Sequence, residues 1–167
     1  SGVTLLVASS GYDPEREFEQ IRTLVSQGAD GLLLIGFARP EKTYDFLNSR
    51  QIPYVTTWNY RSEVDGFNIG FDNRKAAGQL AQKVIEVGHT NIGMITADTD
   101  FNDRALNRVE GVHETMERAG LSEKKLQIVS TTYTLESGAR AFEKLMGTPS
   151  PPTVVICGND VLAAGAI

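Results

Sequence analysis

The sequence predicts an α/β protein whose parallel sheets are flanked by helices. Short apolar runs alternate with amphipathic helical stretches along the 167 residues, which is typical of strand–helix–strand units with right-handed crossovers. Two of the runs, at 32–35 and 154–156, contain only apolar side chains. Such continuous runs indicate strands that are covered on both faces, as in a parallel sheet between helices.

The predicted strands are the apolar runs that Gly, Pro or Asp residues bound. They cover residues 3–9, 31–36, 53–58, 67–71, 92–97, 127–133 and 153–157. The first predicted helix has Asp13 as its N-cap and Pro14 as its first residue, and Gly28 ends it. The other predicted helices cover residues 40–49, 73–87, 103–119 and 136–146, and residues 163–167 continue a further helical pattern.

One connection breaks the alternation. Residues 59–66 are polar and too few for a helix, whereas a parallel pair in one sheet needs a crossover of about a dozen residues. Strands 53–58 and 67–71 are therefore predicted not to be parallel neighbours. We expect residues 1–59 to form part of an N-terminal lobe, residues 60–66 an interlobe crossover and residues 67–167 most of a C-terminal lobe.

Charge and cysteine content exclude several classes of protein. Lys and Arg number 16 and Asp and Glu 21, for a formal net charge of −5, whereas domains that hold nucleic acid by bulk charge are basic. The single cysteine, Cys157, excludes an intramolecular disulfide and a multi-cysteine zinc site. No apolar run approaches the ~18–20 residues of a membrane span, so no membrane partner is expected. The first residue is not Met, and we expect a piece of a longer protein.

Catalysis has no positive signal. Phosphate-binding loops, dinucleotide-binding motifs and nucleophile elbows are absent from the sequence. His89 follows a helix-ending glycine and His113 lies among glutamates on a helix, so we expect surface or capping roles for both. Asp98, Asp100 and Asp103 share one loop, where metal or acid–base chemistry is the alternative to solvation and helix capping. We expect no enzyme, no metal and no cofactor.

Polar and aromatic residues follow the predicted strands. In open α/β sheets, ligands bind outside the carboxyl ends of the strands. The residues at those ends are Ser9, Ser10, Phe37, Trp58, Asn59, Asp72, Asn73, residues 98–104, Tyr133 and residues 158–160. Aromatic faces together with amide, carboxylate and guanidinium groups suit a small polar ligand such as a sugar or nucleoside. The alternatives are interlobe or core packing for Trp58 and a plug at the strand end for Tyr133.

Several short motifs occur in a characteristic order and spacing. They are DPERE at 13–17, GADGLLL at 28–34, IP at 52–53, GFDNRKAAG at 70–78, GHTNIGMI at 88–95, RVEG at 108–111, AGL at 119–121, ESG at 136–138 and PTVVICGNDVLAAGA at 152–166. This ordered set resembles the effector-binding core of the lactose-repressor/galactose-repressor (LacI/GalR) family of transcriptional regulators. The resemblance covers essentially the whole chain.

The resemblance implies a two-lobed, periplasmic-binding-protein-like (type I) α/β fold that is incomplete at both ends. It implies a cytoplasmic repressor core, active as a homodimer, that binds a small effector such as a sugar or sugar derivative in the interlobe cleft. Operator DNA would be bound by a helix-turn-helix domain that precedes this sequence. The alternative is a periplasmic sugar-binding protein of a transporter, which shares the fold and the cleft.

The resemblance also implies ligand-binding roles for individual residues. Arg108 matches the helix-borne arginine that reaches the effector, and Tyr133 matches the aromatic residue that stacks on it. Asn159 matches the asparagine that hydrogen-bonds ligand hydroxyls, which leaves Asp160 as the expected N-cap of the last helix. Asp72 is likewise expected to be a helix cap.

Two residues depart from the family pattern. Trp58 stands where many members carry an aspartate, which exchanges a hydroxyl acceptor for an aromatic face. Arg104 stands where a small polar residue is common, and it shares one helix face with Arg108 at a spacing of i, i+4. The two arginines together suit an anionic effector, such as a sugar phosphate or sugar acid. The alternative for Arg108 is a surface arginine beside Asn107 or Glu110.

Overall fold

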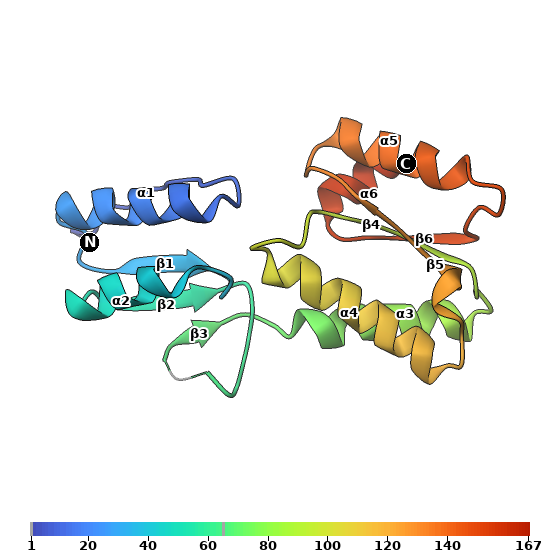
Figure 1. Ribbon diagram of the computed structural model, residues 1–167, viewed down its shortest axis with the longest axis horizontal. Coiled ribbons are helices and arrows are strands. Elements are labelled where there is room, and N and C mark those ends of the chain that lie inside the picture. Colours follow the sequence, from blue (N-terminus) through green and yellow to red (C-terminus); the bar gives the residue numbers. More distant parts are fainter. Residues whose placement is uncertain (1, 65) are drawn as a thin grey trace. The chain divides into compact units, whose positions relative to one another are not determined.

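The computed structural model describes residues 2–64 and 66–167, and the chain divides into two compact units, Ser1–Gly70 and Phe71–Ile167. Each unit is an α/β layer structure with a parallel three-stranded sheet (Figure 1). The predicted fold class is confirmed. Within the described ranges, no helix has the length and apolar content needed to cross a membrane.

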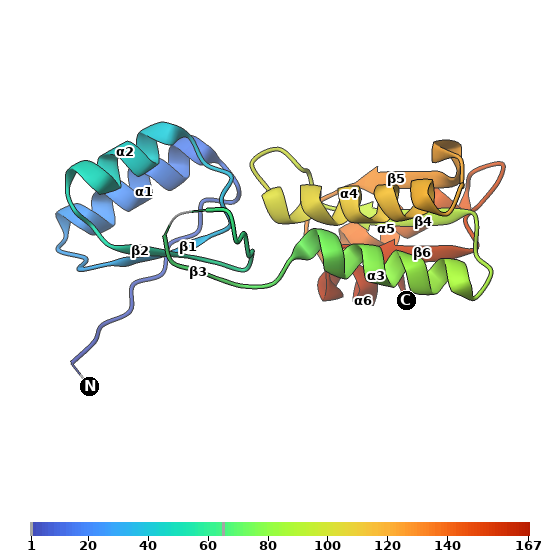
Figure 2. The same cartoon turned by 90° about the horizontal axis from the view of Figure 1, so that it is seen from below.

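The sheet of the first unit has the order β1-β2-β3. Its strands are β1 (Leu32–Ile35), β2 (Tyr54–Thr57) and β3 (Asn68–Ile69), and its helices are α1 (Pro14–Ser26) and α2 (Glu41–Ser49). Both helices lie on the same face of the sheet (Figure 2). Ile21, Leu34 and Leu47 form the core between the layers. The alternate β1 side chains, Leu33 and Ile35, are exposed, because side chains in a strand alternate between faces.

Two predictions for the first unit are wrong: that strands 53–58 and 67–71 are not parallel neighbours, and that residues 3–9 form a strand. Strands β2 and β3 are parallel neighbours, with Thr56 opposite Asn68 and Thr57 opposite Ile69. A helical crossover is not needed, because β3 contributes only two residues to the ladder. The described residues of the predicted crossover, 60–64 and 66, and β3 itself therefore belong to the first unit, whose boundary follows Gly70.

The predicted strand at 3–9 is not formed either. Among the described residues, no strand pairs with this segment, and its apolar side chains are exposed, 87% in the case of Val3. An apolar pattern gives a strand only where a neighbouring strand supplies the backbone hydrogen bonds.

The second unit has the strand order β5-β4-β6. Its strands are β4 (Ile92–Thr96), β5 (Leu126–Ser130) and β6 (Val154–Cys157). Helices α3 (Asn73–Glu86) and α4 (Asp103–Arg118) cover one face, and α5 (Leu135–Met146) and α6 (Asp160–Ala166) cover the other (Figures 1 and 2). All five β4 residues are buried, as expected of the central strand between two helical layers.

Helices α3 and α4 approach each other closely at glycine. A Cβ atom added to Gly111 would lie 2.0 Å from the carbonyl oxygen of Arg74. Arg74 also forms ion pairs across the two helices, with Glu114 and, at 3.8 Å, with Glu110. The absence of a side chain at Gly111 therefore allows α3 and α4 to approach closely at the point where Gly111 faces Arg74.

Candidate functional site

The carboxyl end of the second unit's sheet carries a small polar cluster. Arg108, on the second turn of α4, donates from Nη1 to Asn73 Oδ1 at 2.6 Å. Its Nη2 atom lies 3.4 Å from the hydroxyl oxygen of Tyr133, which follows β5. The structure thus brings together two of the predicted ligand-binding residues, Arg108 and Tyr133, and orients the arginine away from the alternative partners beside it on α4.

Local capping holds this cluster in position. The side chain of Asn102 accepts a hydrogen bond from the backbone N–H of Ala105 at the start of α4. The Nδ2 atom of Asn102 lies 3.4 Å from the Tyr133 hydroxyl oxygen. The ring of Tyr133 packs against the buried cluster that contains Ile95 and Leu162. The ring of Tyr133 is therefore anchored in the core, while its hydroxyl lies beside Arg108.

The positive charge of Arg108 has no carboxylate partner within ion-pair distance among the described residues. Both hydrogen-bond partners that hold it, Asn73 and Tyr133, are neutral. Its Nε atom is buried and makes no hydrogen bond within the described chain. A buried donor without a partner is costly unless a ligand or water accepts from it. An anionic ligand at the guanidinium would offset the charge of Arg108.

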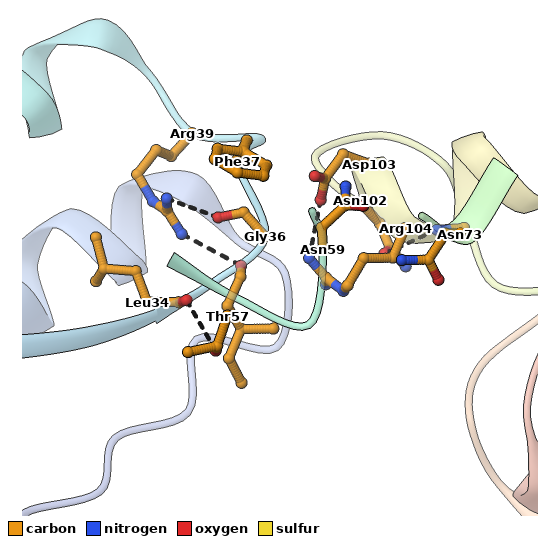
Figure 3. A network of polar contacts seen from close by, with 12 residues as sticks. Leu34, Gly36, Phe37, Arg39, Thr57, Asn59, Asn73, Asn102, Asp103 and Arg104 are labelled. Carbon is orange, nitrogen blue, oxygen red and sulfur yellow. Dashed lines mark hydrogen bonds and ion pairs between the residues drawn. The ribbon is translucent and has the colours of Figure 1, made fainter. Parts of the chain in front are cut away.

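Arg104 lies in a different electrostatic environment. Its Nη1 atom is 2.9 Å from Asp103 Oδ1 (Figure 3). The carboxylate offsets the guanidinium charge, so Arg104 does not add the second uncompensated positive group that its spacing suggested. A contact between Arg104 and an effector stays a prediction.

Asn159, rather than Asp160, caps the last helix. Its Oδ1 atom accepts from the backbone N–H of Leu162 at 2.9 Å, so the predicted capping role of Asp160 is wrong. Asp160 instead accepts from the adjacent N–H of Val161. Asn159 still lies at the carboxyl end of β6, and its contact with a ligand stays a prediction. The cap predicted for Asp72 is confirmed, because its side chain accepts from Lys75 N.

Trp58 belongs to the first unit, directly after β2. Its side chain is 63% exposed, so it is not part of that unit's core. Its φ of 67° lies in the left-handed region, which costs a non-glycine residue about 1–2 kcal/mol. The backbone N–H donates to Ile69 O at 3.0 Å, so the pairing of β2 with β3 holds this conformation. A strained, exposed tryptophan at a strand end is compatible with ligand stacking, which stays a prediction.

The sequence placed Asn73 among the strand-end residues but did not predict its contact with Arg108, and it gave no role to Arg39. Asn73 is the first residue of α3, and only the approach of α3 to α4 reveals its contact with Arg108. In the first unit, buried Arg39 donates to the carbonyl oxygen of Gly36 (Figure 3). It also donates to Ile35 O and pairs with Glu17 at 3.3 Å. Burial lowers the pKa of Arg39, but the electrostatic and hydrogen-bonding interactions with Glu17 and Tyr44 together outweigh burial, so the pKa is raised. Arg39 thus organises the carboxyl end of β1.

The described residues contain no group of three His, Cys, Asp or Glu side chains that could hold a metal ion. His89 Nδ1 lies 2.9 Å from Thr153 Oγ1, and His113 lies 3.7 Å from a Glu123 carboxylate oxygen on the exposed side of α4. Asp98 accepts from the backbone N–H of Asp100, which is a loop-turn role.

The chain is similar along its full length to known transcriptional regulators. It is 31% identical to the HTH-type transcriptional repressor PurR of Klebsiella pneumoniae over 99% of this chain and 49% of that protein. A PurR of Shigella dysenteriae gives the same identity and coverage. The chain therefore spans about half the length of the curated relatives it matches.

Solved structures of regulators have the same fold. A LacI-family regulator from Silicibacter pomeroyi matches with a TM-score of 0.88 and 22% identity over 99% of this chain and 50% of that one. The Cra transcriptional dual regulator from Pseudomonas putida, solved with fructose 1-phosphate, matches with a TM-score of 0.81 and 20% identity over 99% and 61%. The sequence model described as "Periplasmic binding proteins and sugar binding domain of LacI family" matches residues 1–167. The chain belongs to this family.

Proposed function

We propose that the chain is the effector-sensing core of a LacI-family transcriptional regulator, and that its effector is a small anion such as a sugar phosphate or sugar acid. The observation that carries this proposal is the uncompensated guanidinium of Arg108 at the carboxyl end of the second unit's sheet, held by neutral partners and with an unpartnered, buried Nε. Support for the anion also comes from two similar structures, one with fructose 1-phosphate and one complexed with phosphate.

Arg108 suits this role for reasons of geometry. Its guanidinium is a planar fork of donors that matches the oxygens of a phosphate or carboxylate, and Lys cannot reproduce that fork. Asn73 holds one arm of the fork, which lowers the entropy that a ligand must remove on binding. Tyr133 and Trp58 would offer aromatic faces to a sugar ring, and the amide of Asn159 would donate to a hydroxyl.

Effector binding in the cleft between two lobes, which the family resemblance implies, would stabilise one state of a pre-existing conformational equilibrium. The DNA-binding domain of the full-length protein would report that shift as a change in operator affinity. In this proposal the protein acts as a homodimer in the cytoplasm, with operator DNA and the effector as partners and without catalysis.

The test begins with a thermal-shift screen of sugars, sugar acids and sugar phosphates on the full-length protein. Titration calorimetry then compares the best ligand on wild type and on Arg108→Lys. We expect a loss of about 1.5–3 kcal/mol in binding free energy, the range for a charge-assisted hydrogen-bonded site. The unliganded melting temperature should stay close to that of wild type.

Arg140→Lys is the matched control, since Arg140 pairs with Glu136 on the exposed surface of α5. It should bind the ligand as wild type does. Equal dissociation constants for wild type and Arg108→Lys, or a neutral sugar as the best ligand, would refute the anionic site. Tight ligand binding without any change in operator affinity would refute the regulatory role and favour a transport-binding protein.

A further inference from the structure

The second unit has a pocket at the opposite end of its sheet from Arg108. Its volume is about 530 Å³, within the range of ~300–1,000 Å³ that small-molecule sites occupy. It is lined by Asn91, which precedes β4, by residues around the start of β5, and by the turn after α5. The five residues of β4 separate the two ends, and at 3.3 Å per residue this is roughly 16 Å. The pocket is therefore distinct from the candidate effector site.

Side-chain amides build a fixed wall for this pocket. Asn91 Nδ2 donates to the carbonyl oxygens of Ser150 and Pro151 at 3.2 and 2.8 Å. Gln127 Nε2 donates to Asn91 Oδ1 at 3.2 Å and to Ser150 O at 2.8 Å. Gln127 Oε1 in turn accepts from the hydroxyl of Thr148 at 3.1 Å. Because the amide oxygens already accept hydrogen bonds, the wall is preorganised.

The charge of the pocket has one sign. Lys124 and Lys125 contribute to its lining, and none of the described lining residues is a carboxylate. The neighbouring Glu123 lies instead beside His113, at 3.7 Å. Ser122 accepts hydrogen bonds from the backbone N–H of Lys124 through Oγ and of Lys125 through its carbonyl oxygen. Its hydroxyl proton is therefore available to a ligand. Two adjacent lysines and serine hydroxyl groups in one lining stand out in a chain whose net charge is −5.

We propose that this pocket binds the phosphoryl group of a small molecule, as a second ligand site beyond the proposed effector site. Lysine ammonium groups bind phosphate as point charges, and hydroxyl groups add donors to its oxygens. The pocket is larger than a phosphate ion, so it has room for a phosphate ester of sugar size. A ligand here contacts the residue before β4, the start of β5 and the turn after α5.

The experiment uses the full-length protein in an Arg108→Gln background, so that binding at the candidate effector site is suppressed. Glucose 6-phosphate, inorganic phosphate and glucose are titrated by calorimetry at 0.15 M salt. We expect glucose 6-phosphate to bind and glucose not to bind. Adding Lys124→Gln and Lys125→Gln should weaken glucose 6-phosphate binding by about tenfold for each lysine, as for the loss of a charge-assisted hydrogen bond.

The matched control removes two exposed lysines elsewhere, Lys83 on α3 and Lys144 on α5, again by substitution with Gln. This control has the same net charge and should bind glucose 6-phosphate as the Arg108→Gln parent does. Glucose 6-phosphate bound more tightly than inorganic phosphate supports a phosphate ester as the ligand, and equal affinity supports free phosphate. Equal effects of the two lysine pairs, or no binding of either phosphate, would overturn the proposal.

Discussion

The neutral residue that holds Arg108 allows charge and geometry to be tested separately. Asn73→Asp replaces the amide oxygen that accepts from Arg108 Nη1 at 2.6 Å with a carboxylate oxygen of nearly the same shape. The hydrogen bond becomes an ion pair, and the long 3.4 Å bond from Asn73 Nδ2 to Phe71 O is lost, so the unliganded protein should gain about 1 kcal/mol in its free energy of unfolding. The guanidinium stays in place, but its charge is compensated.

The same substitution should weaken the binding of an anionic effector. A unit negative charge on residue 73 would lie about 5 Å from a charge bound at the guanidinium. At an effective dielectric constant of about 20, the repulsion is about 3 kcal/mol. This corresponds to roughly a hundredfold increase in the dissociation constant. Fructose 1-phosphate and inorganic phosphate, as probes on the full-length protein, should show the loss in titration calorimetry.

Gln79→Glu adds the same charge to an exposed position on α3 and serves as the control. Its charge lies six residues along the helix, roughly 9 Å away and near the screening length at physiological salt. It should leave the dissociation constant within about twofold of wild type. If Asn73→Asp binds the probes as Gln79→Glu does, Arg108 is not the anion-binding group and the assignment of the site is wrong.

Three further predictions concern the two units by themselves. Gly111→Ala should lower the unfolding free energy measured by urea denaturation by about 3 kcal/mol, because its Cβ would meet Arg74 O at 2.0 Å. A loss under ~1 kcal/mol would show that α3 and α4 can move apart without cost. Arg39→Gln should lower the unfolding free energy by about 3 kcal/mol, because it leaves Glu17 and two carbonyl oxygens without their buried donor. The control Arg22→Gln, at an exposed ion pair, should lower it by less than ~0.5 kcal/mol. Equal losses for the two variants would contradict a structural role of Arg39. Arg74 lowers the pKa of Glu114 from its ordinary 4.5 through a direct hydrogen bond, so this contact stabilises the fold above about pH 4.5 and its contribution is lost as the pH falls through the lowered value. The urea midpoints of wild type and Arg74→Gln should therefore differ at pH 7 and become equal in acid. A difference between the two midpoints that is the same at every pH would contradict the pairing of Arg74 with Glu114.

Local signals predicted most of the fold, and the exceptions depend on distant partners. Asp13 and Asp72 cap their helices as predicted, because a cap needs only backbone N–H groups two or three residues away. The pairing of β2 with β3 and the absence of a strand at 3–9 depend on which strand lies alongside. No periodicity within a segment carries that information.

The candidate site, like the fold, was predicted from the sequence only in part. The family resemblance predicted Arg108 and Tyr133, which lie together in the structure. It did not predict that Asp103 offsets the charge of Arg104, although the two are adjacent in the sequence, because the direction of a side chain is a property of the folded state. Asn159 and Asp160 both suit a cap by residue type, and only the backbone geometry at the start of α6 distinguishes them.

The contact between Asn73 and Arg108 follows from helix packing. Gly111 lies three residues after Arg108 on α4, and the carbonyl oxygen that it approaches belongs to Arg74, the residue next to Asn73. A side chain at Gly111 would separate the helices at this point and lengthen the 2.6 Å contact. Gly111→Ala should therefore weaken anion binding as well as folding, even at temperatures where the variant is fully folded. The glycine thus serves the site by letting α3 approach α4 closely enough for Asn73 to hold the guanidinium of Arg108.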